Sequence, residues 1–502
     1  MKKTVYLLSG LILFLSACNK NDDDGDTSGD VALKSEVNKF IWDGLNYWYY
    51  WQPNVDALAD TKDDDVNSFN TYLNSYNSSE DLFDALVYSS KDDFSWYIDD
   101  VAEQLNSFNG ISKSYGITRG PFVQVSGTTN VVQVVAYTTP DSPAAIAGIK
   151  RGDIISKIDG TILTTENYLL INNLYTEENI SLGFATVSED NTITQTTEKS
   201  ITAATISENP VHFTSVIEEG GKKIGYLVYN GFRGTYNGEL NDVFGEFKAA
   251  GIDELILDFR YNGGGSVLTS ALLASMIDGG APAESNAAIF AKLTYNSKRN
   301  ASNGSLYPFF DEVYLYNKAT GDYDGTTAMN RLSDITKLYV ITTGKTASAS
   351  EMIINGLRPY MPVTTIGETT VGKNEGSITV VDAPNIGTDN PYTNADNRST
   401  KHTIGMQPIV FQIFNTNDEN DYNDGFTPKT EVIEWHYYKG IKAFGDSDEP
   451  LLRATLDDIL GTSSKFNLLA DKNATAIEAG VKTPKFSNEM YIMPNDIKPW
   501  EQ

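Results

Sequence analysis

The chain has 502 residues, and its 67 acidic side chains outnumber its 38 lysines and arginines, which gives a formal net charge of −29 at pH 7. A chain of this length is expected to form about three domains. A chain with this negative charge would repel nucleic-acid phosphates and anionic lipid head groups. Neither is therefore expected to bind the protein through charge. Because Cys18 is the only cysteine, disulfides, thiolate zinc sites and a cysteine nucleophile are excluded.

The N-terminus has the pattern of an export signal. Lys2 and Lys3 precede an apolar run, Val5 to Leu15, that is too short for a good transmembrane span. The next residues, Leu15-Ser16-Ala17-Cys18, resemble a bacterial lipobox, in which the cysteine is diacylated and becomes the first residue of the mature protein. We therefore predict a signal peptide over residues 1–17 and a lipid on Cys18. An ordinary secretory signal with an incidental cysteine is the alternative.

An acidic tether is expected over residues 18–33, because the run Asn19-Lys20-Asn21-Asp22-Asp23-Asp24 has no means of forming a core. A lipidated cysteine followed by lysine and an aspartate run also resembles the signal that carries some Gram-negative lipoproteins to the cell surface. The expected location is the cell envelope, with a lipid anchor in the outer membrane. The periplasmic face and the surface-exposed face both stay open.

Residues 34–105 are predicted to form a small helical N-terminal domain. Apolar side chains recur at helical spacing in its first segment, at Val37, Ile41, Leu45 and Trp48. A second helix is expected to contain Leu82, Leu86 and Tyr88. An aromatic stripe of this kind is far more often core than binding site, so no chemistry is assigned to it.

Residues 106–205 change to short β-rich runs such as Val131 to Val135 and Ile180 to Phe184. Between them, Ser142 to Gly160 resembles the core of bacterial PDZ domains, with a short helix, a glycine turn, Gly-Asp, a strand and an Asp-Gly hairpin turn. Upstream of this stretch, Tyr115-Gly116-Ile117 occupies the position at which such domains have the loop that binds a peptide carboxylate. These three residues are therefore the predicted peptide-binding site. Arg119 and Pro121 make the loop unlike the common glycine-rich form, which leaves recognition of an internal segment open. A PDZ fold that only packs and regulates is a further alternative.

From residue 206 to about 462 strand and helix patterns alternate, which predicts an α/β core with much of its sheet parallel. The expected strands are 224–232, 254–259, 338–343 and 363–366, and the expected helices are 238–250, 266–277 and 349–357. A C-terminal tail, 463–502, follows.

Two glycine-bearing turns of this core could suggest phosphate binding. Gly344-Lys345-Thr346 looks like the end of a P-loop, but the glycine that this motif needs at position 339 is Tyr339. Asn262-Gly263-Gly264-Gly265 lacks the Lys-Ser/Thr that would follow. Neither turn therefore favours nucleotide binding.

A tight turn at a helix N-terminus can instead expose a nucleophile and aim backbone N–H groups at an oxyanion. Thr346-Ala347-Ser348-Ala349-Ser350-Glu351 follows a predicted strand and opens a predicted helix, so Ser348 is a candidate nucleophile. Ser348 and Glu351 also match a capping box, which satisfies backbone N–H groups without any catalysis. The turn alone leaves both interpretations open.

A serine needs a base, and the chain has only three histidines, His212, His402 and His436, none in a recognisable triad motif. A lysine can serve if desolvation lowers its pKa enough to make it neutral. Lys373 is the candidate, at the turn that follows the strand 363–366. The alternative for any single lysine is a solvated surface charge.

These residues together resemble peptidase family S41, the C-terminal processing and tail-specific peptidases. That family pairs Thr-Ala-Ser-Ala-Ser-Glu with a downstream Gly-Lys, and the 25-residue separation that it shows matches Ser348 and Lys373 rather than Ser350. Its Asp-Leu-Arg-x-Asn-x-Gly-Gly motif appears here as Asp258 to Gly265. The resemblance covers about residues 106–460.

The resemblance implies a core of the ClpP/crotonase-like type and a serine endopeptidase that cleaves proteins or peptides recognised near their C-termini. It implies Ser348 as nucleophile, Lys373 as base, and the N–H groups of Gly264 and Ala349 as the oxyanion hole. Two positions depart from the family pattern. Val371 replaces an aromatic residue, and Ser377 stands where many members place a glutamine that orients the lysine, so Ser377 is a candidate third catalytic residue.

Two rival functions stay open at this point. One is a non-catalytic, lipid-anchored protein that keeps the fold and binds peptides. The other is a glycan-binding protein, suggested by the 28 tyrosines and 6 tryptophans, but it leaves the Ser348–Lys373 spacing unexplained. The acidic loop 415–424 fails the EF-hand register at Tyr422, so no metal or cofactor is implied.

The substitution Cys18→Ser should move the protein from the membrane fraction to the soluble fraction, because no other segment of the sequence is expected to anchor it. The wild type, with two or more acyl chains, should resist washing in high salt. Fractionation and immunoblotting measure both, and Lys20→Ser serves as the control that alters the tether and keeps the thiol. A Cys18→Ser protein that stays in the membrane after signal cleavage would contradict the lipoprotein prediction.

Overall fold

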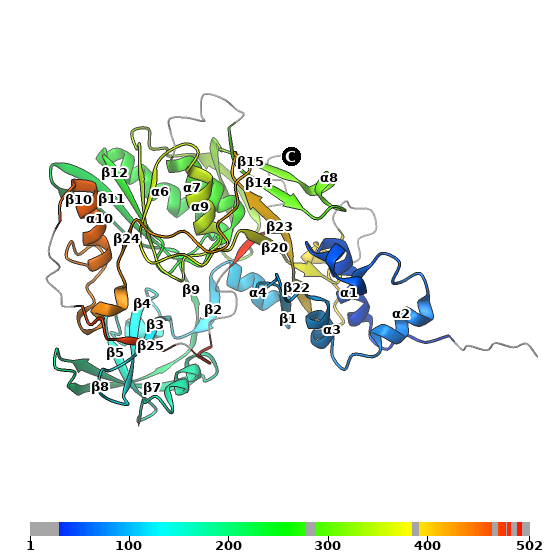
Figure 1. The fold of residues 1–502 in the computed structure, drawn as a ribbon, viewed down its shortest axis with the longest axis horizontal. Coiled ribbons are helices and arrows are strands. Elements are labelled where there is room, and N and C mark those ends of the chain that lie inside the picture. The colour runs from blue at the N-terminus through cyan, green and yellow to red at the C-terminus, as the bar shows by residue number, and fades with distance from the viewer. Residues whose placement is uncertain are drawn as a thin grey trace, which may run out of the picture.

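The structure is a computed structural model, and it describes residues 30–277, 288–383, 391–463, 470–477, 479–482 and 489–493. The predicted signal peptide, Cys18 and most of the acidic tether lie outside these ranges. Within them, no helix has the length and apolar character needed to cross a membrane. Figure 1 shows the N-terminal helices and the β-rich domain on two different sides of the α/β core.

The N-terminal region is mainly helical, as predicted. Its elements are α1 (Glu36–Trp48), η1 (Gln52–Asn54), η2 (Asp56–Leu58), α2 (Val66–Leu73), α3 (Ser79–Leu86), β1 (Trp96–Ile98) and α4 (Val101–Phe108). Ser35, Asp65, Ser78 and Asp100 begin the four α-helices, each accepting a hydrogen bond from a backbone N–H of the first turn. Helix α3 ends at Leu86, so the expectation that Tyr88 belongs to it is wrong: Val87 at its C-cap is already extended. Helix α4 crosses the predicted boundary at residue 105.

The β-rich domain contains the strands expected between 106 and 205. Its elements are β2 (Ile111–Ser114), β3 (Ile117–Gln124), β4 (Val131–Thr138), α5 (Pro143–Ile146), β5 (Ile154–Ile158), β6 (Thr161–Ile162), η3 (Tyr168–Tyr175), β7 (Asn179–Val187), β8 (Ile193–Thr202) and β9 (Ala204–Ser207). Strand β25 (Thr475–Ile477), from the region predicted to be a tail, adds to the outer edge of β3 in the sheet order β25-β3-β4-β5-β7-β8. This sheet therefore combines strands from residues 117–202 with a strand from residues 475–477.

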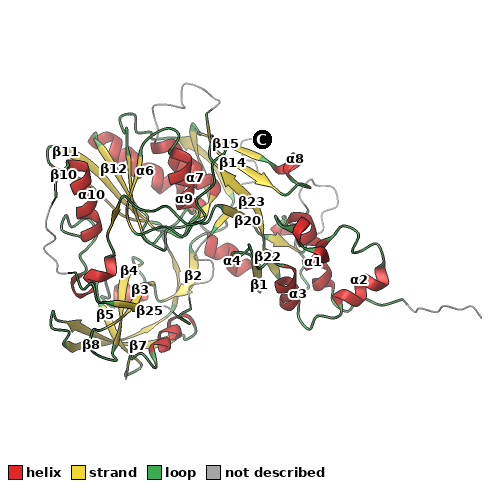
Figure 2. Ribbon diagram, viewed as in Figure 1, coloured by secondary structure: helices red, strands yellow, loops and turns green. Residues whose placement is uncertain are grey.

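The α/β core is built on the sheet β10-β11-β12-β18-β19-β24, in which every neighbouring pair is parallel except β10 and β11. Its strands are β10 (Val211–Glu219), β11 (Lys222–Tyr229), β12 (Glu254–Asp258), β18 (Leu338–Thr342), β19 (Val363–Gly367) and β24 (Thr430–Glu431). Helices α6 (Asn237–Ala250), α7 (Val267–Ile277) and α9 (Ala349–Leu357) share one hydrophobic core with one face of the sheet, and α10 (Pro450–Leu460) packs on the other face (Figure 2). The predicted core strands and helices are confirmed, with ends shifted by a few residues.

A second sheet lies beside the first, in the order β13-β26-β20-β23-β14-β15. Its strands are β13 (Gly265–Ser266), β14 (Ile289–Tyr295), β15 (Ser305–Pro308), β20 (Glu375–Ile378), β23 (Ile409–Phe414) and β26 (Met490–Ile492). Other elements are η4 (Gly234–Tyr236), α8 (Asn300–Asn303), the hairpin β16 (Glu312–Tyr316) and β17 (Tyr323–Ala328), β21 (Val380–Val381), η5 (Ala395–Asn397), β22 (Gly405–Gln407) and η6 (Glu434–Gly440). The sequence patterns did not predict this second sheet.

A buried ionic cluster joins the β-rich domain to the core. The guanidinium of Arg260, which is fully buried, contacts Asp258 at 2.6 Å and both Glu434 and Glu449 at 2.7 Å. Arg151 of the β-rich domain also pairs with Glu434. Because buried charges are costly unless paired, the buried charge of Arg151 depends on a partner from the core.

We expect Arg260→Ala to destabilise the protein by about 3–5 kcal/mol, because it leaves buried carboxylates without their cation. Urea unfolding followed by fluorescence measures the change. The matched control is Lys113→Ala, which breaks a pair with Glu178 whose side chains are 58% and 63% exposed, and which should cost less than about 1 kcal/mol. An equal loss of stability from the two substitutions would contradict the conclusion that Arg260 holds a buried ionic cluster together.

Candidate active site

Ser348 lies at the turn between strand β18 and helix α9, as the sequence predicted. Its backbone has φ 63° and ψ −115°, a conformation that a residue with a side chain adopts only at a cost of about 1–3 kcal/mol. A strained serine between a strand and a helix is the geometry of a nucleophile elbow. The Ser348 side chain is buried, and its Oγ has no hydrogen-bond partner among the described residues. The direct bond to a base that a catalytic serine needs is therefore not formed in this structure.

Glu351 holds the Ser348 turn and the Lys373 turn together. One of its carboxylate oxygens accepts hydrogen bonds from the backbone N–H groups of Ser348 (2.8 Å) and Lys373 (2.9 Å). The other oxygen accepts from the Thr370 hydroxyl and the Gly372 N–H, both at 2.6 Å. The glutamate half of the predicted capping box is thus present, but its larger effect is to bring the two predicted catalytic residues together across 25 residues of sequence.

Gly372 is required at the Lys373 turn. Its φ of 94° lies in the left-handed region that favours glycine, and a Cβ there would approach the Asn423 carbonyl oxygen to 2.1 Å. Because glycine has no Cβ, the backbone of the loop that contains Asn423 can pack directly against the backbone of this turn. The position of the Lys373 side chain is therefore determined by close backbone packing as well as by Glu351.

Lys373 is a buried amine, with 1% of its surface exposed, and not a surface charge. Its Nζ lies 4.5 Å from the centre of the Phe94 ring, which comes from the N-terminal region. Burial lowers the pKa of Lys373 from 10.5 to about 8, even though the nearby Glu489, Glu375 and Asp92 act in the opposite direction. A large fraction of the amine is therefore neutral near pH 8, as a proton acceptor must be.

The acidic groups beside Lys373 are themselves buried. Burial raises the pKa of Glu375 to about 7, with a further increase from the charge of Asp92. Burial also raises the pKa of Glu489 well above its ordinary value, and the positive charge of Lys373 only partly opposes this. The pKa of Lys373 thus depends on the charges of Asp92 in the N-terminal region, Glu375 in β20 and Glu489 in the segment before β26.

Gly264 and Ala349, the predicted oxyanion donors, lie next to each other. A Cβ added to Gly264 would be 2.7 Å from Ser348 Cβ and 3.1 Å from Ala349 N. The N–H of Gly264, however, donates to Asn262 Oδ1 at 2.9 Å, so an oxyanion would have to compete with that side chain. Asn262 also fixes the turn, because its carbonyl oxygen accepts from Ala347 N–H and from the Ser350 hydroxyl. The role of the two N–H groups stays a prediction.

Ser377 belongs to a chain of buried hydrogen bonds. Its hydroxyl donates to the Met490 carbonyl at 3.1 Å and accepts from Gln407 Nε2 at 3.0 Å. The Gln407 side chain accepts in turn from Gln104 and Thr379. Ser377 therefore ties β20 to β26 here, and its expected part in orienting Lys373 stays a prediction.

The predicted carboxylate-binding loop begins strand β3. Tyr115 is buried and its hydroxyl donates to the Glu177 carbonyl, while Gly116 N–H donates to the Ser114 hydroxyl at 3.2 Å. Ile117 pairs with Thr138 in the sheet. The binding role of this loop stays a prediction.

Two other features do not join the site. His402 pairs with Asp382 at 3.0 Å, but this pair makes no hydrogen bond to Ser348 Oγ.

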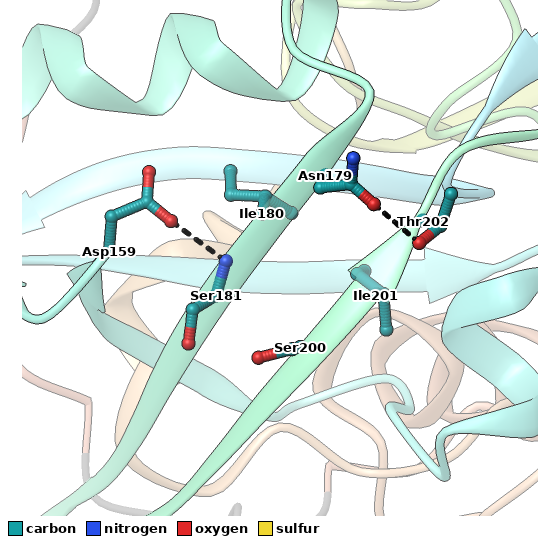
Figure 3. Close-up of a pocket in the computed structure, with 7 residues that line it drawn as sticks. All are labelled: Asp159, Asn179, Ile180, Ser181, Ser200, Ile201 and Thr202. Carbon is teal, nitrogen blue, oxygen red and sulfur yellow. Dashed lines mark hydrogen bonds between the residues drawn. The ribbon is translucent and has the colours of Figure 1, made fainter.

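A shallow pocket of about 250 Å³ lies on the β-rich domain, where Asp159 accepts from Ser181 N–H and Thr202 donates to Asn179 (Figure 3). It contains none of the predicted site residues.

Two family models match the chain. Residues 223–408 match "Peptidase family S41", and residues 36–96 match "Peptidase S41 N-terminal domain". The first range contains Ser348, Lys373, Gly264 and Ala349, and the second contains Phe94 and Asp92. Residues 36–96 and 223–408 are thus similar to S41 peptidases, and C-terminal processing proteases are among the homologues of the chain.

Curated relatives agree with this family. The chain is 28% identical over 254 residues to a carboxyl-terminal-processing protease of Picosynechococcus sp., a match that covers 50% of this chain and 53% of the relative. It is 26% identical over 249 residues to the chloroplastic C-terminal processing peptidase of Tetradesmus obliquus, covering 48% and 47%. The chain thus spans about half the length of the curated relatives it matches. The crystal structure of a candidate S41 protease from Bacteroides fragilis NCTC 9343 shares the fold, with a TM-score of 0.64 and 24% identity over 85% of this chain and 98% of that one.

Sequence reasoning missed the residues that surround Lys373. Phe94 and Asp92 lie in a region to which no chemistry was assigned, and Glu489 lies in the predicted tail. A charge pattern could not have found them, because they are distant from Lys373 in sequence and meet it only in the folded chain. The family match over residues 36–96 is the signal that associates the first two with the peptidase core.

We expect the reactivity of Ser348 toward a serine-directed phosphonate to rise as the pH passes through about 8, because the neutral form of Lys373 must take the serine proton. Glu375→Gln removes a charge that favours the protonated amine. The pKa of Lys373 should then fall, and the rise should move to lower pH by up to about one unit. Labelling rates between about pH 6 and about pH 10 give the profile.

The control for this measurement is Glu312→Gln on the exposed face of β16, which makes the same charge change away from the site. It should leave the profile where it is. A flat profile in the wild type, with the protein folded throughout, would count against a lysine base.

Proposed function

We propose that this chain is a serine endopeptidase in which Ser348 and Lys373 form a catalytic dyad. Ser348 Oγ attacks the carbonyl carbon of the substrate while its proton passes to neutral Lys373 Nζ. The resulting ammonium returns the proton to the leaving amine as the peptide C–N bond breaks. Water then hydrolyses the acyl-enzyme, with Lys373 again accepting and returning a proton. The N–H groups of Gly264 and Ala349 would stabilise the oxyanion once Gly264 turns from Asn262.

One observation carries this proposal: a single buried carboxylate, Glu351, binds the backbone of a strained serine and the backbone of a buried lysine whose pKa is lowered. A capping box alone would need neither the strain nor the lysine. Surface lysines are solvated and keep their ordinary pKa. The combination is therefore better explained by nucleophile activation than by structural packing.

The β-rich domain is proposed to be a PDZ module that selects substrates near their C-termini, with Cys18 carrying a lipid that holds the protein to the outer membrane. The α/β core, residues 206–462, is proposed to be of the ClpP/crotonase-like type. The position of Arg151 in the buried cluster beside Arg260 supports coupling between the module and the catalytic loop that follows Asp258. Binding of a peptide to the module would then help to assemble the catalytic site.

A non-catalytic peptide-binding protein is the second candidate. It is favoured by the absence of a hydrogen bond to Ser348 Oγ from any described residue and by the Gly264 N–H that is directed at Asn262. Labelling of Ser348 by the phosphonate separates the two, because a protein without a working dyad would not be labelled.

Ser348→Ala and Lys373→Ala should each reduce cleavage of a quenched peptide on the order of a thousandfold or more, and the double variant should be little worse than either. The reason is that the two residues act as one unit. Ser350→Ala is the matched control: it removes only a hydrogen bond to the Asn262 carbonyl and should be far milder. Activity of Ser348→Ala equal to that of the wild type would falsify the proposal.

A further inference from the structure

The described part of the C-terminal region, residues 470–477, 479–482 and 489–493, contacts two different surfaces of the molecule. Its first portion, β25, pairs antiparallel with β3, with Thr475 opposite Gln124 and Ile477 opposite Phe122. Addition of a strand to an exposed sheet edge is a general mode of peptide binding. In Figure 1 this short red strand lies beside the cyan β3, far from it in sequence.

The same portion is held from its other side by η3. The Tyr168 hydroxyl donates to the Ala479 carbonyl at 2.6 Å, and Asn172 donates to the Gly480 carbonyl and accepts from Lys482 N–H at 2.9 Å. The segment thus lies in a groove between a strand and a helix, with backbone groups bonded on both sides.

Side chains and direction agree with a bound peptide. Ile477 and Val481, four residues apart, pack on the apolar core of the β-rich domain that contains Tyr115 and Phe122. The segment runs from the Gln124 end of β3 toward Arg119, which donates to the Lys482 carbonyl. It therefore approaches the predicted carboxylate loop with its C-terminal side first, as a peptide recognised near its C-terminus would.

The second portion lies at the catalytic residues. Glu489 N–H donates to the Gly263 carbonyl at 2.9 Å, and the Glu489 carbonyl accepts from Gly265 N–H at 2.5 Å. The chain then continues as β26 between β13 and β20, where the Ser377 hydroxyl donates to the Met490 carbonyl. A Cβ added to Gly264 would meet the Glu489 oxygen at 2.1 Å and Ser348 Cβ at 2.7 Å, so the space beside the nucleophile is already filled.

This portion is not placed as a substrate about to react. The Glu489 carbonyl is bound by Gly265 N–H, while the Gly264 N–H is directed at Asn262. The Glu489 side chain is 4% exposed, its Oε2 has no partner among the described residues, and the same is true of Ser348 Oγ. Buried polar groups without partners are unfavourable, so these two atoms oppose the seated arrangement, whereas burial of Met490 and Ile492 favours it.

We propose that residues 475–477 and 479–482 together with residues 489–493 are an internal ligand of this chain, which occupies the groove between β3 and η3 and the space beside Ser348. An external peptide binds in the same direction only after this segment leaves. The chemistry of the groove favours an extended peptide with apolar side chains four positions apart, as Ile477 and Val481 are. This inference rests on the proposed peptidase function for its consequence, but the occupancy itself can be tested without catalysis.

The test releases the segment after folding. A recognition site for a sequence-specific protease is placed within residues 464–469 of the full chain, and the folded protein is cut and separated from the fragment. Because a competing intramolecular ligand reduces the apparent rate by the fraction of time that it is bound, phosphonate labelling of Ser348 should increase by about tenfold or more. A synthetic peptide with the sequence of residues 473–493 should reverse the increase. Collapse of the fold on release would show a structural strand and overturn the proposal.

A point variant gives the second measurement in an uncut chain. Ile477→Asp with Val481→Asp places charges against the apolar groove and should increase labelling in the same way. Val216→Asp with Leu306→Asp, at exposed apolar positions on β10 and β15, makes the same charge change elsewhere and should have no effect. A folded Ile477→Asp, Val481→Asp protein that is labelled at the wild-type rate would overturn the proposal.

A binding measurement tests the internal ligand independently of the proposed catalytic function. A fluorescent peptide of residues 473–493 should bind the released protein, and its Ser348→Ala form equally well, as measured by anisotropy. Binding without any labelling of Ser348 would leave the internal ligand in place and reject the dyad. No binding and no change in labelling would reject the internal ligand.

Discussion

The Glu351 carboxylate is the contact on which the geometry of this site depends. It accepts four hydrogen bonds, from Ser348, Thr370, Gly372 and Lys373, and so satisfies backbone donors from two separate turns with one buried group. Removing it would leave those donors buried without partners, which is costly. A serine at a strained φ can persist only where the surroundings over-determine it, and Glu351 supplies much of that constraint.

Around this contact, the properties of Lys373 come from distant parts of the chain. Phe94 and Asp92 reach it from the N-terminal region, Glu375 from β20 and Glu489 from the segment before β26. Burial decides the direction of the pKa shift, and the carboxyls limit its size. Residues of the N-terminal region therefore contribute to the environment of the Lys373 amine.

The two described strands of the C-terminal region contact two different parts of the molecule. β25 extends the sheet of the β-rich domain, and β26 completes the second sheet of the core, so one stretch of chain contacts both the predicted recognition groove and the catalytic turn. The buried cluster of Arg151, Arg260 and Glu434 connects the same two parts through side chains. This cluster therefore places the β-rich domain in direct contact with the loop that follows Asp258.

The sequence by itself determined the local elements and the candidate pair. Glycines and apolar periodicity are local properties, which is why helix 349–357 was predicted with its observed ends. Ser348 was preferred to Ser350 because the resemblance to the S41 family implies a separation of 25 residues from the lysine. Only the tertiary structure decided that Glu351 joins the two turns, that Gly264 N–H faces Asn262, and that the predicted tail contributes β25 and β26. Strands of three residues have no usable periodicity, and they form only because folding leaves the edge of β3 and the space between β13 and β20 for them to fill.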